Sequence, residues 1–303
     1  MATTTRAETA TSRPRRFTGL QPARMASYRP VRWPWEVAML ALCLWVYNLT
    51  RNAVPEKLDV AMGHATDVQK LQDWLHISFE RPLNQFVADH EPLAQVMNYY
   101  YATLHFIVTI VVLVWLFRVF PRRYSGARTV LFVTSAVALL GYWFYPLAPP
   151  RLADLGYTDT LELYNTWGSF ATPAVANHSN QYAAMPSLHT AWALWCGVCI
   201  VVCARRLWVR ILGALYPVAT VLAIVGTANH FVLDAVGGAA VLGIGFLAQY
   251  LITGRSAFVD APLPPDDVPA APDATAEVAD EVGIPDFVER GEPAPVQTPT
   301  RSS

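Results

Sequence analysis

Six long apolar segments are the feature that most constrains what this chain can fold into. A helix that crosses a lipid bilayer needs roughly 20 mostly apolar residues. Segments of about that length and character run approximately over residues 34–50, 98–118, 129–147, 189–204, 208–226 and 231–252. Charged residues are scarce, at 15% of the chain against about 25% in a soluble domain. We therefore expect an all-α protein whose core is a six-transmembrane-helix bundle.

Charge is distributed unevenly between the two polar ends and the apolar middle. Residues 1–32 contain seven Arg and one acidic residue, whereas residues 254–303 contain ten acidic residues and three Arg and are rich in Pro and Ala. Both ends have few large apolar residues, so we expect them to be disordered. One membrane domain is expected between them, over residues 33–253. This composition excludes a disulfide-stabilised secreted domain and a nucleic-acid-binding protein.

The positions of Lys and Arg indicate how the spans are oriented, because cytoplasmic loops carry an excess of these residues. Basic residues cluster before the first span, between the second and third, between the fourth and fifth, and after the sixth. These clusters are Arg13, Arg15, Arg16, Arg24, Arg29 and Arg32; Arg118, Arg122, Arg123 and Arg128; Arg205, Arg206 and Arg210; and Arg255. With six spans, all four places share one side. Both termini are thus predicted to be cytoplasmic in a protein of the cell membrane, with extracytoplasmic loops at 51–97, 148–188 and 227–230.

Residues 56–92 form a mixed segment in which apolar and charged residues alternate. Leu71, Trp74 and Leu75, for example, are interleaved with Lys70 and Asp73. This pattern is typical of a helix that lies along a membrane surface or packs on a bundle. We expect one or two interfacial amphipathic helices here.

Three cysteines share one helical segment, since Cys196, Cys199 and Cys203 are spaced at i, i+3 and i+7. A redox or metal-binding role for this spacing needs a polar, accessible setting. In an apolar segment, buried small residues on a helix face are the better interpretation. The sequence shows no other set of metal ligands, and no metal or other cofactor is predicted.

Ionisable residues inside apolar spans are costly unless they are paired or functional. His230 and Asp234 share one face at the start of the sixth span, so the carboxylate can hold one imidazole nitrogen and leave the other free to react. Ser187 and His189 open the fourth span, where a Ser cap, helix N–H groups and a proton donor can meet an anion. Taken separately, each pair is also explained by a structural role.

Arg151 follows the third span and is the only Lys or Arg in the loop 148–188. Its planar guanidinium suits bidentate recognition of phosphate, although an Arg at a membrane interface can also have no role beyond solvation. The predicted orientation places Arg151, His189 and His230 at the same outer face, which favours one shared site. His105, inside the second span at a similar depth, is a further candidate.

These motifs together resemble a known family. Pro186-Ser187-Leu188-His189 resembles the central motif of the type 2 phosphatidic acid phosphatase superfamily, His230-x-x-x-Asp234 resembles its last motif, and Arg151 falls where the first motif has its Arg. Over about residues 35–252 the pattern is similar to the inositol phosphorylceramide synthase-like (inositolphosphotransferase-like) branch. The matching stretches are Ala-Pro-Pro-Arg-Leu at 148–152, Ala-Ala-Met-Pro-Ser-Leu-His-Thr-Ala-Trp at 183–192, Thr-Ala-Asn-His-Phe at 227–231 and Asn-Tyr-Tyr-Tyr-Ala-Thr-Leu-His at 98–105.

The resemblance implies a six-helix membrane enzyme and a role for each matching residue. His230 would be the nucleophile that forms a phosphohistidine, Asp234 would orient it, and His189 would protonate the leaving group and then activate the incoming water or alcohol. The residues expected to bind the phosphate are Arg151, Ser187 and Asn229, and those expected to bind the rest of the substrate are His105 and Tyr145. No metal takes part in this chemistry.

Two cations of the phosphatase pattern are missing. Its Lys, seven residues before the Arg of the first motif, is replaced by Phe144. Its Ser-Arg pair, which precedes the last His, is replaced by Ala223 and Ile224. These losses disfavour hydrolysis of a highly charged free phosphate, and they are easier to reconcile with a lipid phosphodiester or a transferase reaction.

The sequence thus predicts an integral-membrane phosphotransferase that moves a phosphoryl headgroup, such as inositol phosphate, between lipids at the extracytoplasmic face. Hydrolysis of a lipid-linked phosphomonoester is the alternative reaction. A non-catalytic lipid-binding membrane protein is the alternative of another class, because fold and activity can separate. The expected partners are a phospholipid or lipid-linked phosphate and the membrane itself, and the oligomeric state is not predicted.

Overall fold

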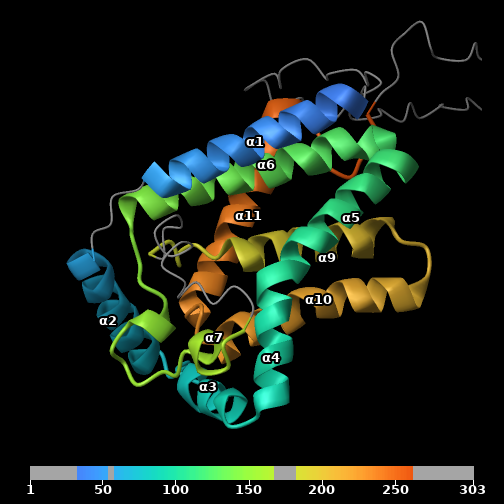
Figure 1. Ribbon diagram of the computed structural model, residues 1–303. Coiled ribbons are helices and arrows are strands. Elements are labelled where there is room, and N and C mark those ends of the chain that lie inside the picture. The colour runs from blue at the N-terminus through green and yellow to red at the C-terminus, as the bar shows by residue number, and fades with distance from the viewer. Residues whose placement is uncertain (1–32, 54–57, 167–181, 262–303) are drawn as a thin grey trace, which may run out of the picture. The chain divides into compact units, whose positions relative to one another are not determined.

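The computed structural model describes residues 33–53, 58–166 and 182–261. Within these ranges the secondary structure is helical, which confirms the all-α class (Figure 1). The α-helices are α1 (Trp33–Ala53), α2 (Leu58–Trp74), α3 (Glu80–Ala88), α4 (Glu91–Tyr99), α5 (His105–Val119), α6 (Pro121–Phe144), α7 (Thr160–Leu163), α9 (Leu188–Cys203), α10 (Leu207–Gly226) and α11 (Val232–Thr253). A π-helix, Tyr100–Leu104, joins α4 to α5, and a short 3-10 helix, Pro150–Leu152, follows α6. The two predicted disordered ends lie almost wholly outside the described residues.

Among the described residues, four helices are long and apolar enough to cross a membrane. They are the continuous helix Glu91–Val119, which combines α4, the π-helix and α5, together with α6, α10 and α11. They correspond to the second, third, fifth and sixth predicted spans. The fourth predicted span is α9, whose 16 residues extend about 24 Å at 1.5 Å per residue, less than the roughly 30 Å of a hydrocarbon core. The first predicted span, α1, is not among the four, so the count of six spans remains a prediction.

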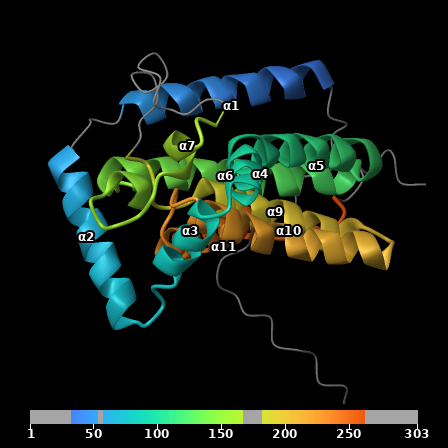
Figure 2. The same ribbon diagram turned by 60° about the horizontal axis from the view of Figure 1, so that its bottom comes forward.

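Helix α9 is the central helix of the bundle and packs against α5, α6, α10 and α11. Figures 1 and 2 show α9 and α10 side by side, joined by a short turn. An α-helix that is apolar all round is stable only when it is buried, and most of α9 is buried. Cys196, Cys199 and Cys203 are buried within it, which confirms that they are small core residues. The indole N–H of Trp195 is satisfied by the carbonyl oxygen of Ala127, at 2.9 Å.

Helices α2 and α3 occupy the mixed segment for which one or two amphipathic helices were predicted. The buried face of α2, which includes Ala61, Ala65 and Val68, packs against a second, smaller core. That core contains Leu147 from the segment after α6 and Phe231 from the segment before α11. These two helices therefore cover the loops that join the long helices.

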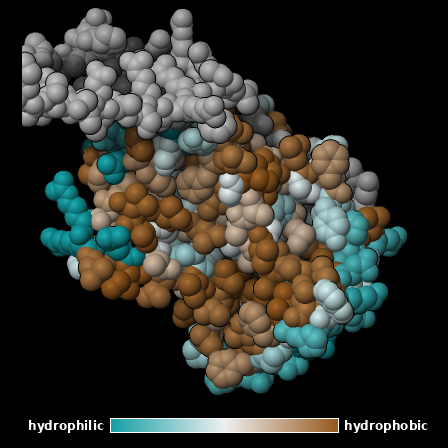
Figure 3. Space-filling view, turned by 180° about the vertical axis from the view of Figure 1, so that it is seen from behind, coloured by the Kyte–Doolittle hydropathy of each residue, from teal (hydrophilic) through white to brown (hydrophobic). Residues whose placement is uncertain are grey.

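The surface of the bundle is rich in large apolar side chains. On the face drawn in Figure 3, hydrophobic residues form broad patches, and hydrophilic residues gather toward the margins. Exposed apolar residues lie on several of the long helices, among them Ile110, Val114, Leu140, Leu215 and Leu247. Contiguous apolar surface of this kind marks contact with lipid or with another protein, and it agrees with the four apolar helices.

Candidate active site

Three loop segments meet at one end of the bundle and are tied together by backbone hydrogen bonds. The N–H of Arg151, after α6, donates to the carbonyl oxygen of Ala228, before α11, at 2.9 Å. The N–H of Ser187, before α9, donates to the carbonyl oxygen of Asp234 in α11, also at 2.9 Å. A Cβ added at Gly238 would collide with the Ser187 carbonyl oxygen, so glycine allows α11 to approach the start of α9. The three candidate motifs are thereby brought together.

The two histidines of the predicted motifs face one another. Nε2 of His230 lies 3.3 Å from Nδ1 of His189. On its other side, Nδ1 of His230 lies 3.2 Å from Oδ2 of Asp234, as the i and i+4 spacing predicted. The same carboxylate oxygen accepts the N–H of Phe231 at 2.9 Å, which fixes the start of α11. Both His230 and Asp234 are buried, and one imidazole nitrogen of His230 is directed at His189.

The π-helix supplies the other side of this histidine pair. Single π-helical turns within α-helices occur frequently at functional sites. Here the turn precedes His105, whose ring centroid lies 4.2 Å from that of His189. Tyr101, within the turn, stacks on His189 with a centroid separation of 4.5 Å and an interplanar angle of 27°. The His189 ring is therefore in contact with His105, Tyr101 and His230.

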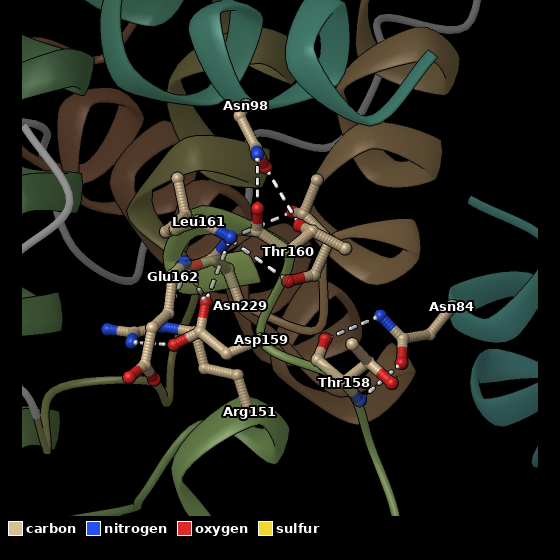
Figure 4. A network of polar contacts seen from close by, with 10 residues as sticks. Asn84, Asn98, Arg151, Thr158, Asp159, Thr160, Leu161, Glu162 and Asn229 are labelled. Atoms are coloured by element: carbon tan, nitrogen blue, oxygen red, sulfur yellow. Dashed lines mark hydrogen bonds and ion pairs between the residues drawn. The ribbon is translucent and has the colours of Figure 1, made fainter. Parts of the chain in front are cut away.

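Arg151 is connected to the histidine cluster by a hydrogen bond to Asn229, and it forms an ion pair with Asp159. Its Nε donates to Oδ1 of Asn229 at 3.0 Å, one residue before His230. One terminal nitrogen forms an ion pair with Oδ2 of Asp159 at 2.8 Å. The Asn229 amide nitrogen in turn donates to the Thr227 hydroxyl at 2.8 Å. Figure 4 shows Arg151 placed between Asn229 and Asp159.

A family model described as the PAP2 superfamily matches residues 66–248, more than half of the chain, and this range includes every group described above. The chain belongs to the PAP2 superfamily. No curated protein and no solved structure gives a significant match. The match bears out the superfamily that the motifs suggested, and it does not distinguish the inositol phosphorylceramide synthase-like branch.

Other predicted site residues of this PAP2 chain have additional structural contacts. The hydroxyl oxygen of Ser187 caps α9, accepting the N–H of Thr190 at 3.3 Å, and Ser187 is fully buried. Tyr145, at the end of α6, stacks on His64 of α2 with a centroid separation of 4.1 Å. In the described ranges, no cluster of His, Cys, Asp or Glu is arranged to hold a metal ion.

The two positions at which the PAP2 pattern has lost a cation differ in their surroundings. Phe144 is 77% exposed at the end of α6. Ile224 is fully buried, and its carbonyl oxygen accepts the N–H groups of Asn229 and His230, at 2.9 and 3.1 Å. A long cationic side chain at position 224 would therefore begin next to the histidine cluster. Its replacement by Ile leaves Arg151 as the cation that is connected to the cluster by a hydrogen bond.

Three residues of the site region carry no signal that the sequence interpretation used, and a fourth, Tyr101, entered it only as part of the matching stretch 98–105. Asp159 pairs with Arg151 from a loop, and Tyr101, within the π-helix, stacks on His189. Glu80 and Gln72, from α3 and α2, accept N–H groups of the first turn of α11. The sequence showed that apolar and charged residues alternate over 56–92, but it did not show which groups Glu80 and Gln72 bind.

Proposed function

We propose that this PAP2 protein is an integral-membrane phosphotransferase that moves a phosphoryl headgroup, such as inositol phosphate, between lipids through a phosphohistidine at His230. The observation that carries the proposal is the geometry of this residue. Its Nδ1 is held by the Asp234 carboxylate, and its Nε2 is directed at His189. A nucleophile beside a base, with a third group that orients it, is the general arrangement of covalent catalysis.

Two balanced steps follow from this arrangement. In the first, the Nε2 lone pair of His230 attacks phosphorus, an N–P bond forms, and the P–O bond to the donor lipid breaks. His189 gives its proton to the leaving oxygen, so the lipid departs as a neutral alcohol. In the second step, His189 accepts the proton of an acceptor hydroxyl whose oxygen attacks phosphorus. The N–P bond then breaks, and both histidines return to their starting states.

Electrostatic stabilisation of the phosphoryl oxygens falls to Arg151, with hydrogen bonds from the segments around Asn229 and Ser187. Arg has five N–H donors, of which the contacts with Asn229 and Asp159 use two. The remaining donors can hold charge that develops on the transferring group. His105 and Tyr145 are proposed to contact the rest of the substrate.

Transfer is preferred to hydrolysis because the site has few cations. With Phe144 and Ile224 in place of a Lys and an Arg, the site is poorly suited to a doubly charged phosphomonoester. Hydrolysis of a lipid phosphomonoester is nevertheless the runner-up, since the same two histidines would activate water. We place the site at the extracytoplasmic face of a six-span bundle, on the strength of the Lys and Arg distribution.

Purified full-length protein should transfer the headgroup of labelled phosphatidylinositol to ceramide in mixed micelles, and His230→Ala should lower kcat by at least about a thousandfold. A second measurement is mass spectrometry of protein that is denatured and digested in alkali, where an N–P bond survives, and it should find a phosphoryl adduct on His230. His90→Ala, an exposed histidine between α3 and α4, is the matched control and should retain activity. Turnover that is equal in wild type and His230→Ala would exclude the mechanism, and release of free phosphate from phosphatidic acid alone would select the phosphatase.

A further inference from the structure

The short segment 158–160 in the outer loop is held unusually firmly by two buried asparagines. Asn84 of α3 donates to the carbonyl oxygen of Thr158 at 3.0 Å and accepts its N–H at 2.8 Å. Asn98 of α4 donates to the carbonyl oxygen of Thr160 at 2.9 Å and accepts its hydroxyl at 2.9 Å. Both asparagines are fully buried. The backbone on either side of Asp159 is therefore fixed to two helices (Figure 4).

The carboxylate of Asp159 has two separate tasks, one for each oxygen. Oδ1 accepts the N–H groups of Leu161 and Glu162, at 2.9 and 3.2 Å, and so caps α7. Oδ2 accepts from Arg151 at 2.8 Å. The ion pair is shielded from solvent, with side-chain exposures of 10% for Arg151 and 14% for Asp159. Since its backbone is clamped and its other oxygen is engaged, Asp159 is a fixed counter-charge to Arg151.

A fixed counter-charge changes the net charge that an incoming phosphate meets. Arg151 and Asp159 together sum to zero, whereas a phosphomonoester carries about −1.5 to −2 charges near neutral pH and a phosphodiester carries one. The second negative charge of a monoester would lie near the Asp159 carboxylate in a shielded setting, where charges interact more strongly than in water. Neither Phe144 nor Ile224 supplies a compensating cation.

We propose that Asp159 is a specificity-determining residue, which makes the site select singly charged phosphodiesters over doubly charged phosphomonoesters. This inference rests on the proposed phosphotransfer at His230, and it adds the residue that determines the charge of the substrate. If Asp159 only positioned Arg151, replacing it would change the affinities for phosphomonoesters and phosphodiesters by the same factor. Selectivity between them is therefore the property that separates the two roles.

Asp159→Asn isolates the charge. Asn is as good a helix cap as Asp, so the Oδ1 contacts with α7 can be kept while the ion pair is lost. The probes are ethyl phosphate and diethyl phosphate, each titrated against purified full-length protein by thermal shift at about pH 8, where the monoester is doubly charged. Asp159→Asn should tighten ethyl phosphate binding about tenfold and change diethyl phosphate binding by less than about threefold. The ratio of phosphatidic acid turnover to phosphatidylinositol turnover should rise in parallel.

Asp154→Asn is the matched control, because Asp154 is an exposed acid of the same loop. It should leave both affinities unchanged. The inference would be overturned if Asp159→Asn changed neither affinity, or changed both equally. It would also be overturned if Asp154→Asn gave the same change, or if neither the wild type nor Asp159→Asn bound either probe. His230→Ala separates this inference from the proposed function: it should abolish turnover while the Asp159-dependent difference in binding persists. If His230→Ala leaves turnover intact, the proposed function fails on its own.

Discussion

At the scale of single residues, Asp234 links His230, which precedes α11, to the first turn of that helix. Its Oδ2 accepts from the Phe231 N–H and lies 3.2 Å from Nδ1 of His230. A carboxylate in this position keeps the proton on Nδ1, so that Nε2 carries the lone pair, and it stabilises the imidazole ring if it becomes charged. In the proposed mechanism, the reactivity of His230 would therefore depend on the Asp234 carboxylate.

Asp234→Asn should lower kcat for headgroup transfer by about a thousandfold while KM changes by less than about threefold, since the amide neither carries the charge nor fixes the tautomer. Steady-state kinetics of the purified variant measures both quantities. Thermal unfolding in the same detergent checks that the variant is folded. Asp67→Asn, which removes an exposed acid of α2, should behave as wild type. A kcat for Asp234→Asn within tenfold of wild type would contradict the orienting role.

How much of this site follows from the sequence depends on how each contact is made. The pairing of His230 with Asp234 was predicted from their i and i+4 spacing, although His230 precedes α11 and the contact is made where Asp234 also accepts the Phe231 N–H. The ion pair of Arg151 with Asp159 was not predicted, because Arg151 lies in a short 3-10 helix and Asp159 caps a different helix, so no single period relates them. The stacking of Tyr101 on His189 depends on a π-helical turn, which hydropathy does not predict.

At the scale of elements, the first turn of α11 is capped by side chains from two other helices. The N–H of Val232 donates to Oε1 of Glu80 in α3 at 3.0 Å, and the N–H of Leu233 donates to Oε1 of Gln72 in α2 at 2.9 Å. Both side chains are fully buried. The first turn of a helix leaves N–H groups without intrahelical partners, so α2 and α3 complete the helix that begins beside His230. Their amphipathic pattern predicted the helices but not this function.

Glu80→Leu should lower the free energy of unfolding by about 1–3 kcal/mol, because it leaves a buried N–H without an acceptor. It should also reduce kcat by displacing the start of α11. Glu80→Gln keeps an oxygen acceptor and should restore most of both properties. Denaturant or thermal unfolding, together with turnover, measures these effects. Gln85→Leu, an exposed position on the same helix, is the control. If Glu80→Leu and Gln85→Leu prove equally stable and equally active, α3 does not support α11.

At the scale of the whole molecule, the length of each apolar segment determines which predicted spans are matched by a helix that can cross a membrane. Four predicted spans correspond to helices long and apolar enough to cross a membrane. Helix α9 is short and lies at the centre, where contacts with four other helices, rather than lipid, determine its surroundings. Helix α1 packs against α6, where Glu36 pairs with Arg128 and accepts the Tyr124 hydroxyl.

The orientation predicted from Lys and Arg can be tested with two exposed positions on opposite sides of α9. Glu162 lies in α7, within the loop predicted to be extracytoplasmic, and Arg206 lies in the turn between α9 and α10. Each is replaced by Cys together with Cys43→Ser, because the other three native cysteines are buried. A membrane-impermeant maleimide should label Glu162→Cys in intact cells and Arg206→Cys only after permeabilisation, since basic turns stay in the cytoplasm. Complete labelling of both in detergent shows that each thiol is reactive. The reverse pattern would place the histidine cluster at the cytoplasmic face, and labelling of both positions from outside would mean that α9 does not cross the membrane.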